Sequence, residues 1–167
     1  MKSSNIKKLA LAGMLVALGV VCSPFSFPIG ASRCFPVQHM VNVLAAVLLG
    51  PYYGVGMAFV TSFIRVLLGT GSLLAFPGSM CGALLCGMVY HFTRKYFLTY
   101  LAEVFGTSIL GGLLAYPIAT LILMNEAALF GYVLPFFVST LGGTVIAAVF
   151  IAVLKRTKVL EQFVSNL

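Results

Sequence analysis

Six long apolar segments with short connections constrain what this chain can fold into. Only 8% of its residues are charged, against about 25% in soluble domains, and the mean hydropathy is +1.11. A bilayer-spanning helix needs about 20 apolar residues, so the chain has room for about six spans and no separate soluble domain. The sequence predicts an all-α membrane protein with one integral domain. The spans are expected at residues 6–22, 37–50, 53–69, 74–93, 98–124 and 130–154.

Basic residues indicate the orientation of these spans. They lie where apolar segments end, at Lys2, Lys7 and Lys8, at Arg94 and Lys95, and at Lys155, Arg156 and Lys158. Lys and Arg are enriched in cytoplasmic loops, and six spans place all three groups on one side, whereas five or seven spans do not. We therefore expect a multi-pass plasma-membrane protein with both termini in the cytoplasm. These clusters explain the net charge of +7, so the charge does not indicate nucleic-acid binding.

The sequence lacks the motifs of several functional classes, namely common hydrolases, metal-binding proteins and secondary transporters. It has no HExxH or GxSxG motif and no two neighbouring acidic residues. Its four cysteines lack the spacing of metal sites. Neither paired broken helices nor a chain of acidic or histidine residues crosses the predicted membrane. We expect no catalytic residue, metal or cofactor. A disulfide between Cys22 and Cys34, both predicted on the outer side, stays open.

Hydrogen-bonding side chains gather in the predicted outer half of the protein. Gln38 and Asn42 are four residues apart, so they share a helix face, and His39 lies beside them. Arg65 is a charge inside an apolar segment, which by default marks a functional site. Snorkelling to the outer surface is the alternative for Arg65, but snorkelling cations belong mainly on the cytoplasmic side, so an inward direction is favoured. These groups, with Ser79, predict a small-molecule pocket.

Aromatic and loop residues complete the predicted pocket. Phe35, Phe76 and Tyr116 are candidates for flat surfaces that contact a ring. Residues 23–36 contain three prolines and a glycine, so they cannot form a lipid-exposed helix. We interpret them as a loop that covers the pocket.

Glu103 is expected to have a structural role. It lies near the predicted cytoplasmic start of the fifth span, where a carboxylate suits the helix N-terminus. Arg94 and Lys95 are its predicted partners.

The first span carries a stripe of small residues. Gly13 and Ala17 are four residues apart and share a face with Ala10. Small residues let a second helix approach closely. Two interpretations stay open, namely packing within this protein and docking of a partner helix.

Three stretches carry a resemblance to a known family. They are Phe35-Pro36-Val37-Gln38-His39-Met40-Val41-Asn42-Val43, Leu68-Gly69-Thr70-Gly71-Ser72-Leu73-Leu74-Ala75-Phe76-Pro77-Gly78-Ser79-Met80 and Glu103-Val104-Phe105-Gly106-Thr107. In them the chain resembles the ThiW family of S components, the substrate-capture subunits of energy-coupling factor (ECF) transporters. The resemblance extends over essentially the whole chain.

This resemblance implies a fold, partners and a substrate. S components have six helices, cytoplasmic termini and an outward pocket roofed by loops, and they dock on a membrane scaffold subunit that works with two ATP-binding subunits in prokaryotes. The implied substrate is hydroxyethylthiazole, a thiamine precursor, for which a few hydrogen bonds and an aromatic sandwich suffice. The implied docking residues are Ala10, Gly13 and Ala17. The implied pocket residues are Phe35, Gln38, His39, Asn42, Arg65, Phe76, Ser79 and Tyr116.

Three rival functions stay open on the sequence. The first is an autonomous channel or secondary transporter for a small molecule, and the second is an S component for another vitamin. The third is a membrane-embedded enzyme that uses His39 and Arg65.

Overall fold

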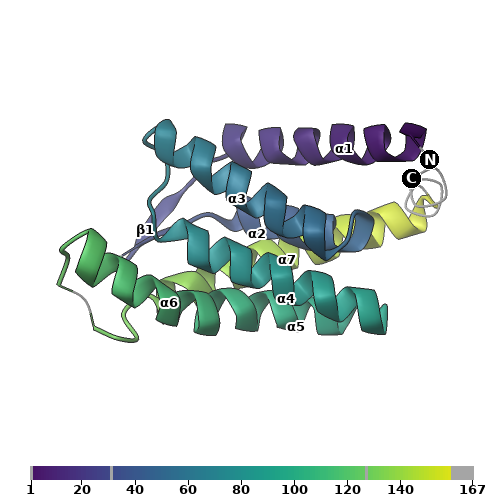
Figure 1. Ribbon diagram of the computed structural model, residues 1–167. Helices are drawn as coiled ribbons and strands as arrows, with labels where there is room; N and C mark the ends of the chain where they lie inside the picture. Colours follow the sequence, from purple (N-terminus) through teal and green to yellow (C-terminus); the bar gives the residue numbers. More distant parts are fainter. Residues whose placement is uncertain (1, 31, 127, 159–167) are drawn as a thin grey trace.

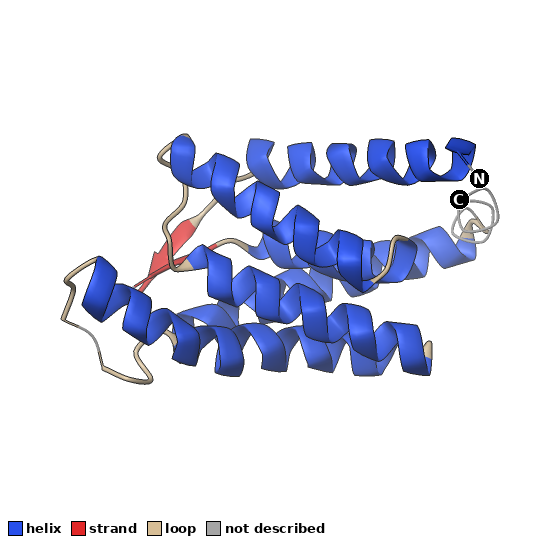
Figure 2. Ribbon diagram, in the orientation of Figure 1, coloured by secondary structure: helices blue, strands red, loops and turns tan. Residues whose placement is uncertain are grey.

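The computed structural model describes residues 2–30, 32–126 and 128–158, which form six helical segments and one short β-hairpin (Figures 1 and 2). The first three segments are α1 (Lys2–Val21), α2 (Pro36–Leu48) and α3 (Pro51–Leu67), with β1 (Phe27–Ile29) and β2 (Ser32–Cys34) between α1 and α2. α4 (Ala75–Thr93) and α7 (Val133–Arg156) are the fourth and sixth segments. The fifth comprises α5 (Tyr96–Phe105), η1 (Gly106–Gly111), α6 (Gly112–Pro117) and η2 (Ile118–Ile122).

The segments begin and end within a few residues of the predicted bounds. By length and composition, three of the described helices can cross a membrane: Ala75–Thr93, Tyr96–Ile122 and Val133–Arg156. α2 is also apolar but has only 13 residues. Ten of those residues are buried inside the protein, so neighbouring helices rather than lipid surround this short helix.

The helices lie side by side in an elongated bundle with two distinct ends (Figure 1). The hairpin, the α3–α4 connection, the end of η2 and the start of α7 lie at one end, which we call the hairpin end. The start of α1, the end of α7 and the α4–α5 connection lie at the other, which we call the terminal end. Arg94 and Lys95 in the α4–α5 connection, and Lys155 and Arg156 in the last turn of α7, therefore share one end of the bundle.

α2 is the central helix of this bundle. It packs against α3, α4 and α7, whereas α1 lies at the edge and packs mainly on α3. Close approach to α7 depends on Gly143, because a Cβ there would collide with the Pro36 carbonyl oxygen and lie 2.6 Å from the His39 Cβ. This contact fixes the start of α2, which carries the predicted pocket residues.

The fifth segment contains two π-helical stretches. The sequence predicts a kink at Tyr116-Pro117, and η2 begins directly after Pro117. Proline lacks the backbone N–H that an α-helix needs at this position, and the rare π turns occur mostly as bulges inside α-helices such as this one. η1 packs tightly on α4, because a Cβ on Gly106 would lie 2.9 Å from the Cys81 carbonyl oxygen.

The predicted loop 23–36 contains the hairpin of β1 and β2, and we use the name hairpin for these strands together with the adjoining Phe35. Its strands pair antiparallel with Phe27 opposite Cys34, and the turn contains Gly30 at φ +55°. The hairpin is tied to α7, because the Cys34 thiol donates to the Pro135 carbonyl oxygen at 3.2 Å and the Phe35 N–H donates to Ser139 Oγ at 2.7 Å. Cys22 and Cys34 are both free thiols, and burial raises the pKa of the Cys34 thiol.

The contact between α2 and α7 yields a first prediction. Gly143→Ala is expected to cost about 1–3 kcal/mol through overpacking, measured as a lower melting temperature in detergent. Gly56→Ala is the matched control, because nothing lies within 4 Å of a Cβ at this position and Ala is the better helix former by about 0.5–1 kcal/mol. Equal melting temperatures for the two variants would contradict this packing.

Candidate functional site

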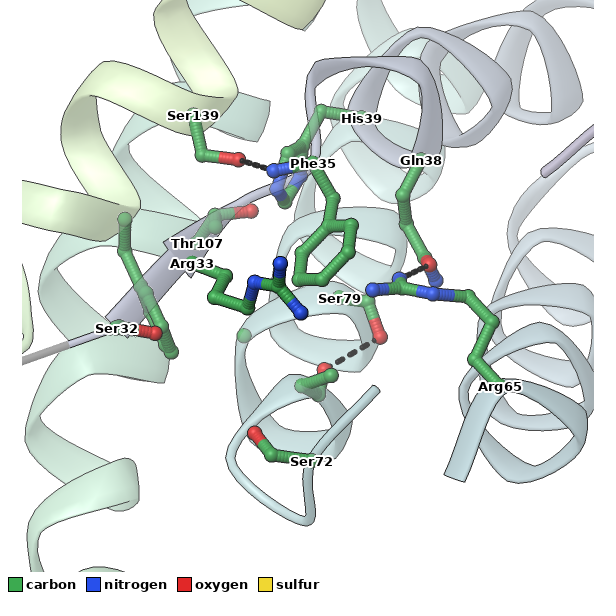
Figure 3. A pocket seen from close by; sticks show the side chains of 13 residues that line it. Ser32, Arg33, Phe35, Gln38, His39, Arg65, Ser72, Ser79, Thr107 and Ser139 are labelled. Atoms are coloured by element: carbon green, nitrogen blue, oxygen red, sulfur yellow. Dashed lines mark hydrogen bonds between the residues drawn. The ribbon is translucent and has the colours of Figure 1, made fainter. Parts of the chain in front are cut away.

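A small polar cavity lies near the hairpin end of the bundle (Figure 3). Its volume is about 30 Å³, which leaves space for only a few water molecules. The hairpin, α2, α3, α4, η1 and α7 all contribute to its wall. The lining residues are Ser32, Arg33, Phe35, Gln38, His39, Arg65, Ser72, Ala75, Gly78, Ser79, Thr107, Phe136 and Ser139.

Arg65 is the central charged group of this cavity. It lies in the last turn of α3 and is only 1% exposed, so its side chain points inward. Its Nη1 donates to Gln38 Oε1, and its Cζ lies 3.6 Å from the centroid of the Phe35 ring. Its Nε and Nη2 have no hydrogen-bond partner.

Three interactions offset the burial of this guanidinium. Burying an ion costs several kcal/mol. A desolvated cation–π contact returns about 2 kcal/mol, a hydrogen bond to a charged group about 1.5–3 kcal/mol and a helix C-terminus up to about 2 kcal/mol. Arg65 has all three, through Phe35, Gln38 and the end of α3. These interactions offset part of the cost of burial, and the Nε–Nη2 edge of the guanidinium is left without a partner.

A second polar cluster lies behind the cavity wall, around Glu103. Its Oε1 accepts hydrogen bonds from Asn42 Nδ2 at 3.0 Å and Thr107 Oγ1 at 3.3 Å, and it lies 3.0 Å from His39 Nδ1. Its Oε2 has no partner, and the residue is fully buried. Glu103 therefore fixes two α2 side chains, one of which, His39, lines the cavity.

The predicted pairing of Glu103 with Arg94 or Lys95 is wrong. The fifth segment begins at Tyr96, so Glu103 lies two turns into the helix and faces α2 and α4. The start of a helix does not hold this carboxylate, because its acceptor oxygen faces the donors of α2 and η1. The informative signal was a carboxylate inside a long apolar segment, which by default marks a functional site.

A serine hydroxyl and a serine carbonyl oxygen accept further hydrogen bonds from the side-chain amides of α2. Gln38 Nε2 donates to Ser62 Oγ at 3.4 Å, and Ser62 Oγ lies 3.0 Å from Ser79 Oγ. Asn42 Nδ2 also donates to the Ser79 carbonyl oxygen at 3.1 Å. These bonds join α2, α3 and α4 beside the cavity.

The structure brings together five of the eight predicted pocket residues: Phe35, Gln38, His39, Arg65 and Ser79 line the cavity. Asn42 lies one layer deeper, bonded to Glu103. Phe76 and Tyr116 are not part of the lining. The Phe76 ring packs edge-on against Phe59 at 5.5 Å instead.

Phe35 and Phe136 are the aromatic residues that line the cavity. Phe136 was not predicted, because it is one of 14 phenylalanines and no local pattern singles it out. Gly78 gives it room, since a Cβ there would lie 2.9 Å from Phe136 Cε2. Thr107 and Ser139 also line the cavity, from η1 and α7.

A second, larger cavity adjoins the first at the hairpin end. Its volume is about 230 Å³, and it is lined by residues of the α3–α4 connection together with Leu123 and Asn125. We call it the vestibule. Ser32, Arg33, Phe35 and Ser72 line both cavities. Residues of the hairpin therefore stand between the inner cavity and the vestibule.

Comparison with known proteins identifies the family. The family model described as thiamine-precursor transporter protein (ThiW) matches residues 9–157. The chain belongs to the ThiW family. The match includes every residue that lines the inner cavity and the vestibule, and it confirms the family predicted from the sequence. We found no match among curated proteins or among solved structures. As a member of the ThiW family, this is a membrane transport protein with helices able to span a bilayer.

The Glu103 cluster yields a second prediction. Glu103→Ala removes the shared acceptor of His39, Asn42 and Thr107 and should lower the unfolding free energy by about 3–5 kcal/mol, as for other broken buried pairs. Glu103→Gln keeps an acceptor oxygen and should lose less. Melting temperatures in detergent measure the difference. Glu126→Ala, at an exposed carboxylate, is the control, and an equal loss in the Glu126 and Glu103 variants would contradict the cluster.

Proposed function

We propose that this ThiW protein is the substrate-binding S component of an ECF-type importer and captures hydroxyethylthiazole at the outer face of the plasma membrane of a prokaryote. The match to the thiamine-precursor transporter family over residues 9–157 carries this proposal. A membrane scaffold subunit and two ATP-binding subunits would supply the coupling to ATP hydrolysis. All six helical segments would span the membrane, with both termini in the cytoplasm.

The distribution of charge along the bundle supports this orientation. Arg94, Lys95, Lys155 and Arg156 belong to the terminal end, and basic residues prefer the cytoplasmic side. The vestibule and the inner cavity lie at the hairpin end, which then faces outward.

The two cavities support a role of the hairpin as a lid. Ligand pockets usually measure roughly 300–1,000 Å³, whereas the inner cavity measures about 30 Å³ and the vestibule about 230 Å³. Outward movement of Arg33 and Phe35 would join the two spaces, because both residues line both of them. Phe35 would then be free to stack on the ligand ring.

The exposed face of α1 supports a docking role for its small residues. Ala10, Gly13 and Ala17 are exposed, and nothing lies within 4 Å of a Cβ built on Gly13. Gly13 also lines an apolar groove of about 540 Å³ between α1 and α3, together with Gly56 and Met57. A helix of the scaffold subunit would approach closely along this face.

The substrate assignment is tested by calorimetric titration of the purified protein. Hydroxyethylthiazole should bind, and Gln38→Ala should weaken binding by about tenfold, since one lost hydrogen bond to a charged network is worth about 1.5 kcal/mol. Thr93→Ala, at an exposed position of the terminal end, is the control. Binding of thiamine or another vitamin without binding of the thiazole would refute the assignment.

The docking role is tested by separating binding from uptake. Gly13→Leu combined with Ala17→Leu should abolish uptake of labelled thiazole in cells and leave binding to the purified protein intact. Leucine at Val149, on an exposed face of α7, is the control and should change neither. Loss of binding in the double variant would refute the docking role. Uptake by the protein alone in liposomes would instead indicate an autonomous transporter.

A further inference from the structure

We propose that the preferred ligand of the inner cavity carries an anionic group, a carboxylate or a phosphate monoester, which pairs with the free edge of the Arg65 guanidinium. The inference rests on the proposed function for the thiazole ring and concerns the charge of the form that binds best. It therefore points to an acidic or phosphorylated thiazole rather than to the neutral alcohol.

The unpartnered atoms of Arg65 form a complete binding edge. A guanidinium presents five N–H donors in a rigid plane. The hydrogen bond to Gln38 is made by Nη1, whereas the adjacent Nε and Nη2 are both buried without a partner. The Nε–H bond and one N–H bond of Nη2 are parallel. Such a pair of N–H groups can donate to two oxygens of one carboxylate or phosphate.

Among the described residues, no carboxylate is available to this edge. The chain has three acidic residues. Glu103 is bonded to His39, Asn42 and Thr107, Glu126 is exposed in the α6–α7 connection, and Glu161 lies outside the described residues. Within the described part of the chain, neither Arg33 nor Arg65 forms an ion pair. A buried arginine is normally paired, so the missing partner is one that the ligand can bring.

The surroundings of Arg65 reinforce the positive charge and add donors. Arg33 lines both cavities, and its guanidinium and that of Arg65 lie on opposite sides of the Phe35 ring in the view of Figure 3. The lining of the two cavities contains no acidic residue among the described positions. Ser32 and Ser72 lie in the same wall, and their hydroxyl groups can donate to further oxygens of an anion.

Three thiazole probes test this inference on the purified full chain. They are 4-methyl-5-(2-hydroxyethyl)thiazole, its phosphate monoester, and the acid with a carboxymethyl group in place of the hydroxyethyl group. At constant ionic strength, calorimetry should show at least one anionic probe binding about tenfold or more tightly than the alcohol. Tighter binding of the phosphate monoester would indicate phosphate recognition, and tighter binding of the acid would indicate carboxylate recognition.

Substitutions assign the preference to the guanidinium edge. Arg65→Lys keeps the positive charge but lacks the parallel donors, so it should reduce the ratio of anion to alcohol affinity, and Arg65→Gln should abolish it. Arg33→Gln should lower the ratio to a smaller extent. Arg94→Gln, exposed at the terminal end, is the control and should leave the ratio unchanged. If Arg65→Gln does not fold, the ratio of anion to alcohol affinity in Arg65→Lys tests the inference.

The outcomes separate this inference from the proposed function. If the alcohol binds as tightly as both anionic probes, the inference is overturned while the thiazole assignment stands. If no thiazole binds, inorganic phosphate becomes the probe. Higher melting temperatures with phosphate than with chloride, in wild type but not in Arg65→Lys, would uphold the anion site and refute the thiazole. Equal melting temperatures would overturn both.

Discussion

The burial of three hydrogen-bonding side chains on α2 is the constraint on which the rest of this structure depends. Gln38, His39 and Asn42 lie on a helix that is surrounded by protein, and buried polar groups are costly unless they are bonded. Each therefore needs a partner on another helix. Gln38 meets Arg65 and Ser62, whereas His39 and Asn42 converge on Glu103.

These bonds join the position of the helices to the shape of the site. α3 and the fifth segment cannot move away from α2 without leaving Arg65 or Glu103 unbonded. The same groups form or support the wall of the inner cavity. The same polar network therefore holds the helices together and forms the cavity wall. For this reason a small number of polar residues is enough for both tasks.

The contact between Phe35 and Arg65 links the hairpin to the charge. In the structure the Phe35 ring covers the guanidinium, with Cζ 3.6 Å from the ring centroid, and supplies part of its stabilisation. Opening the hairpin would remove that contact, and a ligand that stacks on or pairs with Arg65 would restore it. A ligand shifts such an equilibrium only by its differential affinity for the two states. Arg65 provides that difference.

Much of the fold was predictable, because six apolar runs give a strong signal at the length of a span. The hairpin was not, since its three-residue strands, one with Pro28, show no alternating pattern. Four pocket residues, Gln38, His39, Arg65 and Ser79, followed from polarity in an apolar chain, and Phe35 followed from its aromatic ring beside them. The partners of Glu103 were not predictable, because its position along the sequence does not reveal which helices it faces. Phe76 and Phe136 are residues of the same type in similar apolar helices. Which of them lines the cavity depends on how α4 and α7 are rotated about their own axes.

We propose that the cavity beside Arg65 opens to the outside and holds the ligand. Cysteine labelling in intact cells tests it most directly, in a background with the four native cysteines replaced. Cysteine at Ser72, which lines both cavities, should react with a membrane-impermeant maleimide and be protected by the thiazole ligand. Cysteine at Thr93, at the terminal end, should react only after the membrane is permeabilised. Labelling at position 93 from outside, or labelling at position 72 that ligand does not slow, would contradict the claim.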